Sequence, residues 1–107
     1  MKKIEVLITP FKVDEVKAAL AKAGVKGITF SEVRDYGHHL SHVGHYRGSE
    51  YLVDLLPEVK LEVIADDEDV SDITETIINA LQNGPLEAGE IVILPMEAVL
   101  HVRSGVR

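Results

Sequence analysis

Apolar and polar residues change their spacing along the chain in a regular order, which predicts its secondary structure. Residues 4–8 form a short apolar run that is typical of a strand. Apolar residues then recur at helical spacing over residues 11–23, and Gly24 favours a left-handed helix end. Residues 27–36 return to strand-like alternation. The first part of the chain therefore predicts strand, helix and strand.

The last part of the chain repeats this order. Residues 59–65 alternate between apolar and polar, and the acidic run 66–69 opens a second amphipathic helix. Residues 91–94 predict an apolar strand, and residues 99–103 predict a last short extended piece. The apolar face of the second helix consists of Val70, Ile73, Ile77, Ile78 and Leu81.

These two similar halves predict an α+β, ferredoxin-like βαββαβ fold, also called split βαβ. At 107 residues the chain is long enough for one core, so we expect a single domain over residues 1–107. One face of the sheet should pack on the two helices. The other face also carries apolar residues, and alone it would expose a larger apolar patch than soluble monomers usually do. We therefore expect an oligomer.

Composition and charge narrow the classes of function. The net charge is −7 and the basic residues are scattered, so the sequence lacks the concentrated basic face that nucleic-acid binding needs. Without cysteine there is no disulfide or thiolate site. No apolar run is long enough to cross a bilayer, and the N-terminus lacks the pattern of a signal peptide. These features favour a cytoplasmic protein that neither inserts into a membrane nor binds nucleic acid.

The usual catalytic motifs are missing from the sequence. It has no nucleophile beside an obvious base, no Gly-x-Ser-x-Gly elbow, no P-loop and no metalloprotease helix. The acidic run 66–69 is typical of a solvated helix start rather than of a cation site. We therefore expect a protein that is not an enzyme.

Polar residues gather in the long connection between Tyr36 and Pro57. A connection of roughly twenty residues exceeds a hairpin turn, and such loops often mediate recognition. Its four histidines are either solvated loop residues, ligands of a transition metal such as Ni²⁺, Zn²⁺ or Cu²⁺, or residues that bind a nucleotide or an anion or form part of a docking surface. Arg47 and Tyr51 are further docking candidates. The four histidines are His38, His39, His42 and His45.

Several stretches resemble the PII signal-transduction proteins. The opening MKKIEVLITPFKVDEVKAAL is similar to the N-terminal signature of that family, and YRGSEY at 46–51 resembles the motif in its exposed T-loop. VDLLP at 53–57, KLE at 60–62 and VRSG at 102–105 continue the similarity. By this resemblance, which covers essentially the full length, the chain is identified as a divergent member of the PII family.

The resemblance implies a homotrimer of ferredoxin-like subunits with adenine nucleotide bound in the clefts between neighbours. The T-loop would span about 37–56, the nucleotide-cradling B-loop about 82–90 and the C-terminal segment about 101–107. The T-loop would dock onto a membrane transporter or a metabolic enzyme, and Tyr51 is the position at which some members are covalently modified. The implied nucleotide-binding residues are Thr29, Gly37, His38, Glu62, Ile64, Gly84, Leu86, Glu87, Gly89, His101 and Arg103.

Departures from the family pattern change the expected ligand. His39 stands in place of a glutamine and Glu58 in place of a lysine, which should impair a response to 2-oxoglutarate. Glu87 replaces a glycine, Glu90 a phosphate-binding lysine and His101 an arginine. A carboxylate repels phosphate where a lysine would attract it, and a triphosphate carries the densest charge. We therefore expect ADP or AMP to bind better than Mg-ATP.

Three readings follow from these residues. The first is a non-catalytic regulator that binds ADP or AMP and acts on its partner through the T-loop. A small anion such as bicarbonate, held by Arg47 or Arg103, is a candidate co-signal. The alternative is a transition-metal-binding or metal-sensing trimer, PII-like or CutA-like, that uses the T-loop histidines. The third is a subunit that docks on a partner and senses nothing.

Overall fold

The computed structural model describes residues 1–36, 56–82 and 90–102. Within these residues the chain forms one four-stranded sheet and two α-helices, in the order that the sequence predicts. The elements are β1 (Lys2–Ile8), α1 (Val13–Lys22), β2 (Ile28–Asp35), β3 (Leu56–Ala65), α2 (Val70–Leu81) and β4 (Glu90–Pro95). Short 3₁₀ turns at Pro10–Lys12 and Asp67–Asp69 precede the two helices.

The strands lie in the order β2-β3-β1-β4, and every neighbouring pair is antiparallel. Val6 on β1 lies opposite Leu61 on one side and Ile91 on the other. This order places the first strand of each half in the middle of the sheet, as in the split βαβ arrangement. The predicted α+β, ferredoxin-like fold is confirmed.

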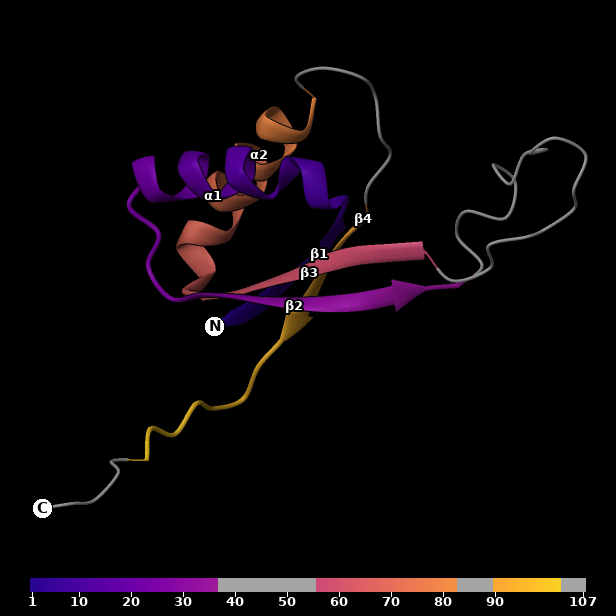
Figure 1. Cartoon of the computed structure of the whole chain (residues 1–107). Coiled ribbons are helices and arrows are strands. Elements are labelled where there is room, and N and C mark those ends of the chain that lie inside the picture. The colour runs from indigo at the N-terminus through magenta and orange to yellow at the C-terminus, as the bar shows by residue number, and fades with distance from the viewer. Residues whose placement is uncertain (37–55, 83–89, 103–107) are drawn as a thin grey trace, which may run out of the picture.

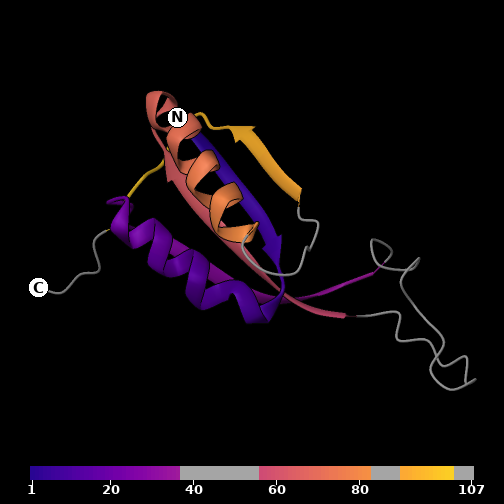
Figure 2. The same ribbon diagram turned by 90° about the horizontal axis from the view of Figure 1, so that it is seen from above.

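Both helices cover the same face of the sheet (Figure 1). Seen from above, they lie next to each other over the strands (Figure 2). The core lies between these two layers, because strands and helices each direct one apolar face into it. Its buried residues are Ile4, Val6, Ile8, Val16, Leu20, Leu61, Val63, Ala65, Ile73, Ile77 and Ala80.

One residue of the predicted apolar helix face does not belong to this core. Ile78 is 39% exposed, whereas Ile73 and Ile77 are buried. Consecutive residues of an α-helix lie about 100° apart around its axis, so Ile78 points away when Ile77 points inward. The prediction that Ile78 faces the core is therefore wrong.

The turn after α1 forms as the sequence predicts. Gly24 has a φ of +86°, in the left-handed region that residues with a Cβ atom seldom adopt. The amide of Gly24 donates to the carbonyl of Ala21, and the amide of Val25 donates to the carbonyl of Leu20. These bonds satisfy carbonyls that the helix end would otherwise leave unpaired, and they direct the chain back toward β2.

The described chain after β4 adds no strand to the sheet. The sequence predicts an extended piece at 99–103; residues 96–102 belong to no strand, and Arg103 lies outside the described residues. The segment leaves the sheet on the side opposite the helices (Figure 1). Leu100 and Val102 are 85% and 90% exposed. Leu100 and Val102 therefore have little apolar contact with the described part of the chain.

Among the described residues, no helix combines the length and apolar composition needed to cross a bilayer.

Candidate functional site

The sheet face that points away from the helices is called here the open face. Side chains alternate along each strand, so the residues between the core positions point to this face. No described helix or strand lies over it (Figure 1). The register places on it Thr29, Ser31 and Val33 of β2, Glu58, Lys60, Glu62 and Ile64 of β3, Lys3, Glu5 and Leu7 of β1, and Glu90, Val92 and Leu94 of β4.

Four charged side chains form a connected group in the middle of the open face. The Nζ atom of Lys3 lies 3.3 Å from Oε2 of Glu5 and 3.4 Å from Oε2 of Glu62. Lys60 lies 3.8 Å from the same Glu62 oxygen. Hydrogen bonds to Glu5 and Glu62 raise the pKa of Lys3 above its usual value, because both carboxylates favour the charged form of the lysine.

The structure brings together three of the predicted nucleotide-binding residues. Thr29 on β2 lies directly opposite Glu62 on β3. Ile64 is the next residue of β3 on the same face and is 45% exposed. A hydroxyl, a carboxylate and an apolar side chain therefore lie side by side at one place on the sheet.

His101, a fourth predicted residue, lies elsewhere. It is exposed and belongs to the segment that leaves the sheet after β4. The other predicted nucleotide-binding residues lie outside the described residues: Gly37, His38, Gly84, Leu86, Glu87, Gly89 and Arg103. The T-loop candidates His39, His42, His45, Arg47 and Tyr51 also lie outside them.

Two of the departures from the family pattern fall on the open face. Glu58 of β3 lies opposite Val33, and Glu90 of β4 lies opposite Leu7. Both positions add negative charge to a face that already carries Glu5 and Glu62. The negative charge of these carboxylates is unfavourable for binding a densely charged anion, such as a triphosphate, on the same surface.

Sequence reasoning did not anticipate the lysines of the open face. Lys3 and Lys60 look like the polar members of alternating strands, and nothing in their local sequence indicates a shared partner. The two lysines are separated by more than fifty residues in the chain, and the β1–β3 register brings both to Glu62. Only knowledge of which strands pair could have identified the group.

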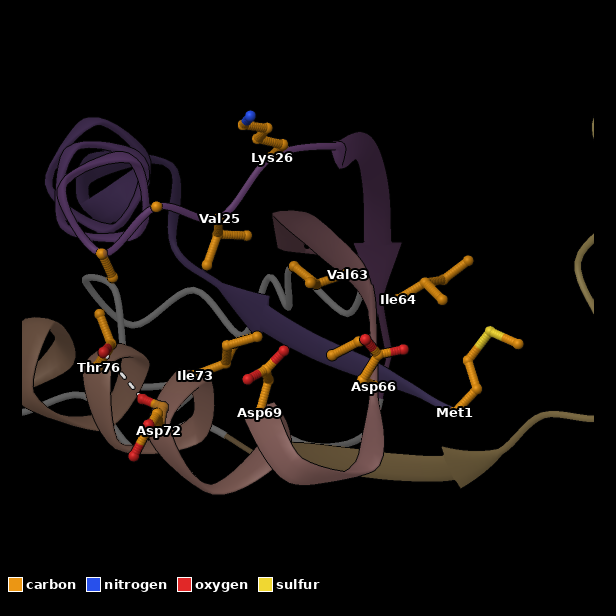
Figure 3. A pocket seen from close by; sticks show the side chains of 13 residues that line it. Met1, Val25, Lys26, Val63, Ile64, Asp66, Asp69, Asp72, Ile73 and Thr76 are labelled. Carbon is orange, nitrogen blue, oxygen red and sulfur yellow. Dashed lines mark hydrogen bonds between the residues drawn. The ribbon is translucent and has the colours of Figure 1, made fainter.

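A hollow lies between the turn after α1 and the start of α2 (Figure 3). It has a volume of about 360 Å³, and Asp66, Asp69 and Asp72 line it together with Lys26. No group of three or more metal-ligating side chains that could hold an ion occurs in the described part of the chain. Asp69 and Asp72 therefore remain consistent with a solvated helix start.

Asp67, in the same acidic run, has a structural role. Its carboxylate lies 2.7 Å from the α-amino group of Met1 and 3.4 Å from Lys2. The hydrogen bond from the amino group, assisted by the charge of Lys2, lowers the pKa of Asp67. This contact links the start of β1 to the 3₁₀ turn before α2.

Comparison with known proteins agrees with the fold and with the resemblance in the sequence. The family model described as nitrogen regulatory protein P-II matches residues 1–106. The chain belongs to the P-II family. It is 47% identical over 105 residues to nitrogen regulatory protein P-II of Rhizobium meliloti (strain 1021), covering 98% of this chain and 94% of the relative.

Two further relatives show the same extent of similarity. Nitrogen regulatory protein P-II of Azospirillum brasilense is 47% identical, and nitrogen regulatory protein P-II 1 of Escherichia coli (strain K12) is 42% identical. Each alignment spans 105 residues, which is 98% of this chain and 94% of the relative. Membership of this family makes the protein a signalling regulator rather than an enzyme, as the sequence predicts.

Proposed function

We propose that this P-II protein binds ADP or AMP, in preference to Mg-ATP, in clefts between the subunits of a homotrimer. Nucleotide binding would change how residues 37–56 dock on a membrane transporter or a metabolic enzyme. Three of the predicted nucleotide-binding residues, Thr29, Glu62 and Ile64, meet on the open face, and this observation carries the proposal.

The chemistry of these three residues suits an adenine nucleoside. A carboxylate accepts hydrogen bonds from the exocyclic amine of adenine or from a ribose hydroxyl. A threonine hydroxyl both donates and accepts, and the side chain of Ile64 offers an apolar surface to a flat base. Because Thr29 and Glu62 lie directly opposite each other, one small ligand can reach both.

The open face and the segment after β4 together support a site that a second subunit completes. Ile64, Val92 and Leu94 are all exposed on the open face. Leu100 and Val102 are exposed on a segment that leads away from its own sheet. A neighbouring copy could cover both apolar surfaces at once, and closed symmetric assemblies are the usual way in which such surfaces are buried.

The preference for ADP or AMP rests on negative charge. Glu90 begins β4 on the open face, and Glu87 precedes it in the chain. Two carboxylates at positions that hold a glycine and a lysine in the family pattern replace attraction by repulsion. The repulsion grows with the number of phosphates, so ATP should lose the most affinity.

Two further ligands are candidate signals for this protein. Bicarbonate, held by Arg47 or Arg103, would act as a co-signal with the nucleotide. A transition metal held by the histidines at 38, 39, 42 and 45 is the alternative signal. If bicarbonate is the co-signal, adding it should change the affinity for ADP. If a transition metal is the signal, the metal should bind without any nucleotide.

Isothermal titration calorimetry with AMP, ADP and ATP, each with and without Mg²⁺, tests the proposal. We expect micromolar ADP or AMP binding and much weaker ATP binding. Tight binding of Mg-ATP would refute the preference, and heat with Ni²⁺ alone would favour the metal-binding reading. Repeating the ADP titration in bicarbonate tests the co-signal, and light scattering of the same samples tests the trimer.

A matched pair of variants assigns the binding to the open face. Glu62→Gln removes the charge of the proposed acceptor and should weaken ADP binding by about tenfold, as expected for a hydrogen bond to a charged group. Glu75→Gln makes the same change at an exposed position of α2 and should leave ADP affinity unchanged. Equal affinities for both variants would place the nucleotide elsewhere.

A further inference from the structure

Two carboxylates face each other on the open face at the centre of the sheet. Glu5 of β1 and Glu62 of β3 are direct cross-strand partners. Like charges in directly opposite positions destabilise a sheet. A nearby cation is therefore needed to offset the repulsion between Glu5 and Glu62.

Lys3 occupies the position that offsets it. Its Nζ atom lies 3.3 Å from Glu5 and 3.4 Å from Glu62, so one cation contacts both carboxylates. Among the described residues of the open face, β4 provides no second cation beside Glu5, because Val92 and Leu94 are neutral. On β3, Lys60 lies opposite Leu7, the next residue of β1 on this face. The carboxylates Glu58 and Glu90 lie further along the same face, and Lys60 contacts Glu62.

The two ion pairs of Glu62 both involve the same carboxylate oxygen, Oε2. Lys3 and Lys60 both lie closest to Oε2, at 3.4 Å and 3.8 Å. Within the described residues no ion pair is made by Oε1 of Glu62. Lys3 lies on β1, on one side of Glu62, and Thr29 lies on β2, on the other side. Both lysines thus lie nearest the same oxygen of Glu62, and Thr29 is the direct partner of Glu62 on the other neighbouring strand.

We propose that Lys3 is a positioning residue for nucleotide recognition. It offsets the charge of Glu5 beside Glu62, so that the Glu62 carboxylate accepts a hydrogen bond from the adenine amino group or from a ribose hydroxyl of the nucleotide. This inference rests on the proposed nucleotide site and adds a residue that does not itself touch the ligand. Lys3 acts by cancelling the charge of Glu5.

A double-mutant cycle separates this role from a merely structural one. Lys3→Met should weaken ADP binding by about tenfold, because Glu62 then shares its surroundings with an uncompensated Glu5. Lys3→Met combined with Glu5→Gln removes the repulsion and should return ADP affinity to within about threefold of the unmodified protein. Lys3→Arg should retain binding, and Lys17→Met, on the exposed side of α1, is the matched control.

The dependence of binding on pH supplies a second readout. When the solution is acidified, Lys3→Met should lose ADP affinity at a higher pH than the unmodified protein, because one carboxylate of the Glu5–Glu62 pair takes up a proton more readily. The double variant should lose this difference. Identical pH profiles for Lys3→Met and the unmodified protein would overturn the inference.

The experiment distinguishes failure of this inference from failure of the proposed function. If the unmodified protein binds no adenine nucleotide, the proposed function fails. NMR titration of the side-chain carboxyl carbons then tests Lys3 directly, and Lys3→Met should raise the apparent pKa of the Glu5–Glu62 pair. If ADP binds but the double variant stays as weak as Lys3→Met, Lys3 has no positioning role. If Lys3→Met does not fold, the ADP and NMR titrations are made on Lys3→Gln, for which the same results are expected.

Discussion

The two faces of the sheet are made by alternate residues of the same strands, yet they differ in what completes them. On β3, Leu61 is fully buried, and the adjacent Glu62 is a partly exposed member of a charged group. The first face is covered by α1 and α2 of its own chain (Figure 2). The open face has no described cover. Stability is therefore concentrated on one face, and recognition is expected on the other.

The difference follows from what each kind of residue needs. Apolar side chains are stabilised by any close-packed cover, which the chain supplies with its own helices. Ionised side chains lose hydration when they are buried, so they remain where a ligand or another subunit can reach them. Substitutions on the two faces should consequently have different kinds of effect.

The largest expected effect is on the helix-covered face. Leu61→Ala should lower the free energy of unfolding by about 2–5 kcal/mol, because it removes methyl groups from a fully buried site and leaves a cavity. Urea denaturation at a fixed protein concentration measures this change. Ile78→Ala on α2 is the control and should lower it by less than about 1 kcal/mol, since Ile78 is exposed and lies away from the open face. Equal losses would show that burial between the sheet and the helices does not account for the effect of Leu61→Ala.

A smaller effect is expected where the chain turns from α1 toward β2. Gly24→Ala should lower the free energy of unfolding by about 1 kcal/mol, because alanine disfavours a φ of +86°. The space around Gly24 admits a Cβ atom, so the cost comes from the backbone and not from a clash. Gly24→Asn should cost less, as asparagine tolerates this conformation better. Thermal denaturation of the two variants compares them, and a reversed order would contradict this cause.

Substitution on the open face should change assembly with little change in the fold. Ile64→Lys places a charge on the exposed apolar surface and should reduce the mass measured by light scattering toward that of one chain. Circular dichroism should remain unchanged. The matched control is Ile78→Lys, because Ile78 is similarly exposed but lies on α2. An assembly that survives Ile64→Lys would show that the open face is not the contact between subunits.

The smallest effect concerns the link between β1 and the turn before α2. The pKa of Asp67 is lower in the folded protein than in the unfolded chain, so the folded state favours its ionised form. Its contribution is complete above the unfolded pKa, near 4, and is lost as the pH falls through the folded value. Asp67→Asn should therefore slightly lower the melting temperature at pH 7.

The same substitution should have no effect at a pH below both values. Because Asp67 is exposed, high salt should also shrink the difference at pH 7. A difference in melting temperature that persists in strong acid would assign the effect to something other than this ion pair.

The sequence by itself determined the elements and the fold. Alternation along β3 predicted which residues are buried, since Leu61, Val63 and Ala65 all lie in the core. Glycine at position 24 predicted the left-handed end of α1, because few other residues accept that conformation. Such features are local. Each depends on the spacing of neighbouring residues or on the conformation of one residue, so the local sequence is enough to predict it.

Part of the candidate site was also predictable from the sequence, through its resemblance to a known family and not through the spacing of its residues. The resemblance to the PII family indicated Thr29, Glu62 and Ile64, and the register then placed them side by side. Residue spacing alone could not have linked Thr29 to Glu62, which are 33 positions apart. Their proximity depends on the pairing of β2 with β3.

Only the tertiary structure decided how the open face is arranged. The order β2-β3-β1-β4 brings Glu5 opposite Glu62 and brings Nζ of Lys3 within 3.4 Å of both carboxylates, although nothing near Lys3 in the sequence indicates these partners. It also decided that Ile78 is exposed and that the chain after Pro95 leaves the sheet. Burial and charge pairing depend on contacts between segments that are distant in the sequence. Those contacts form only when the strands pair and the helices pack in the folded chain.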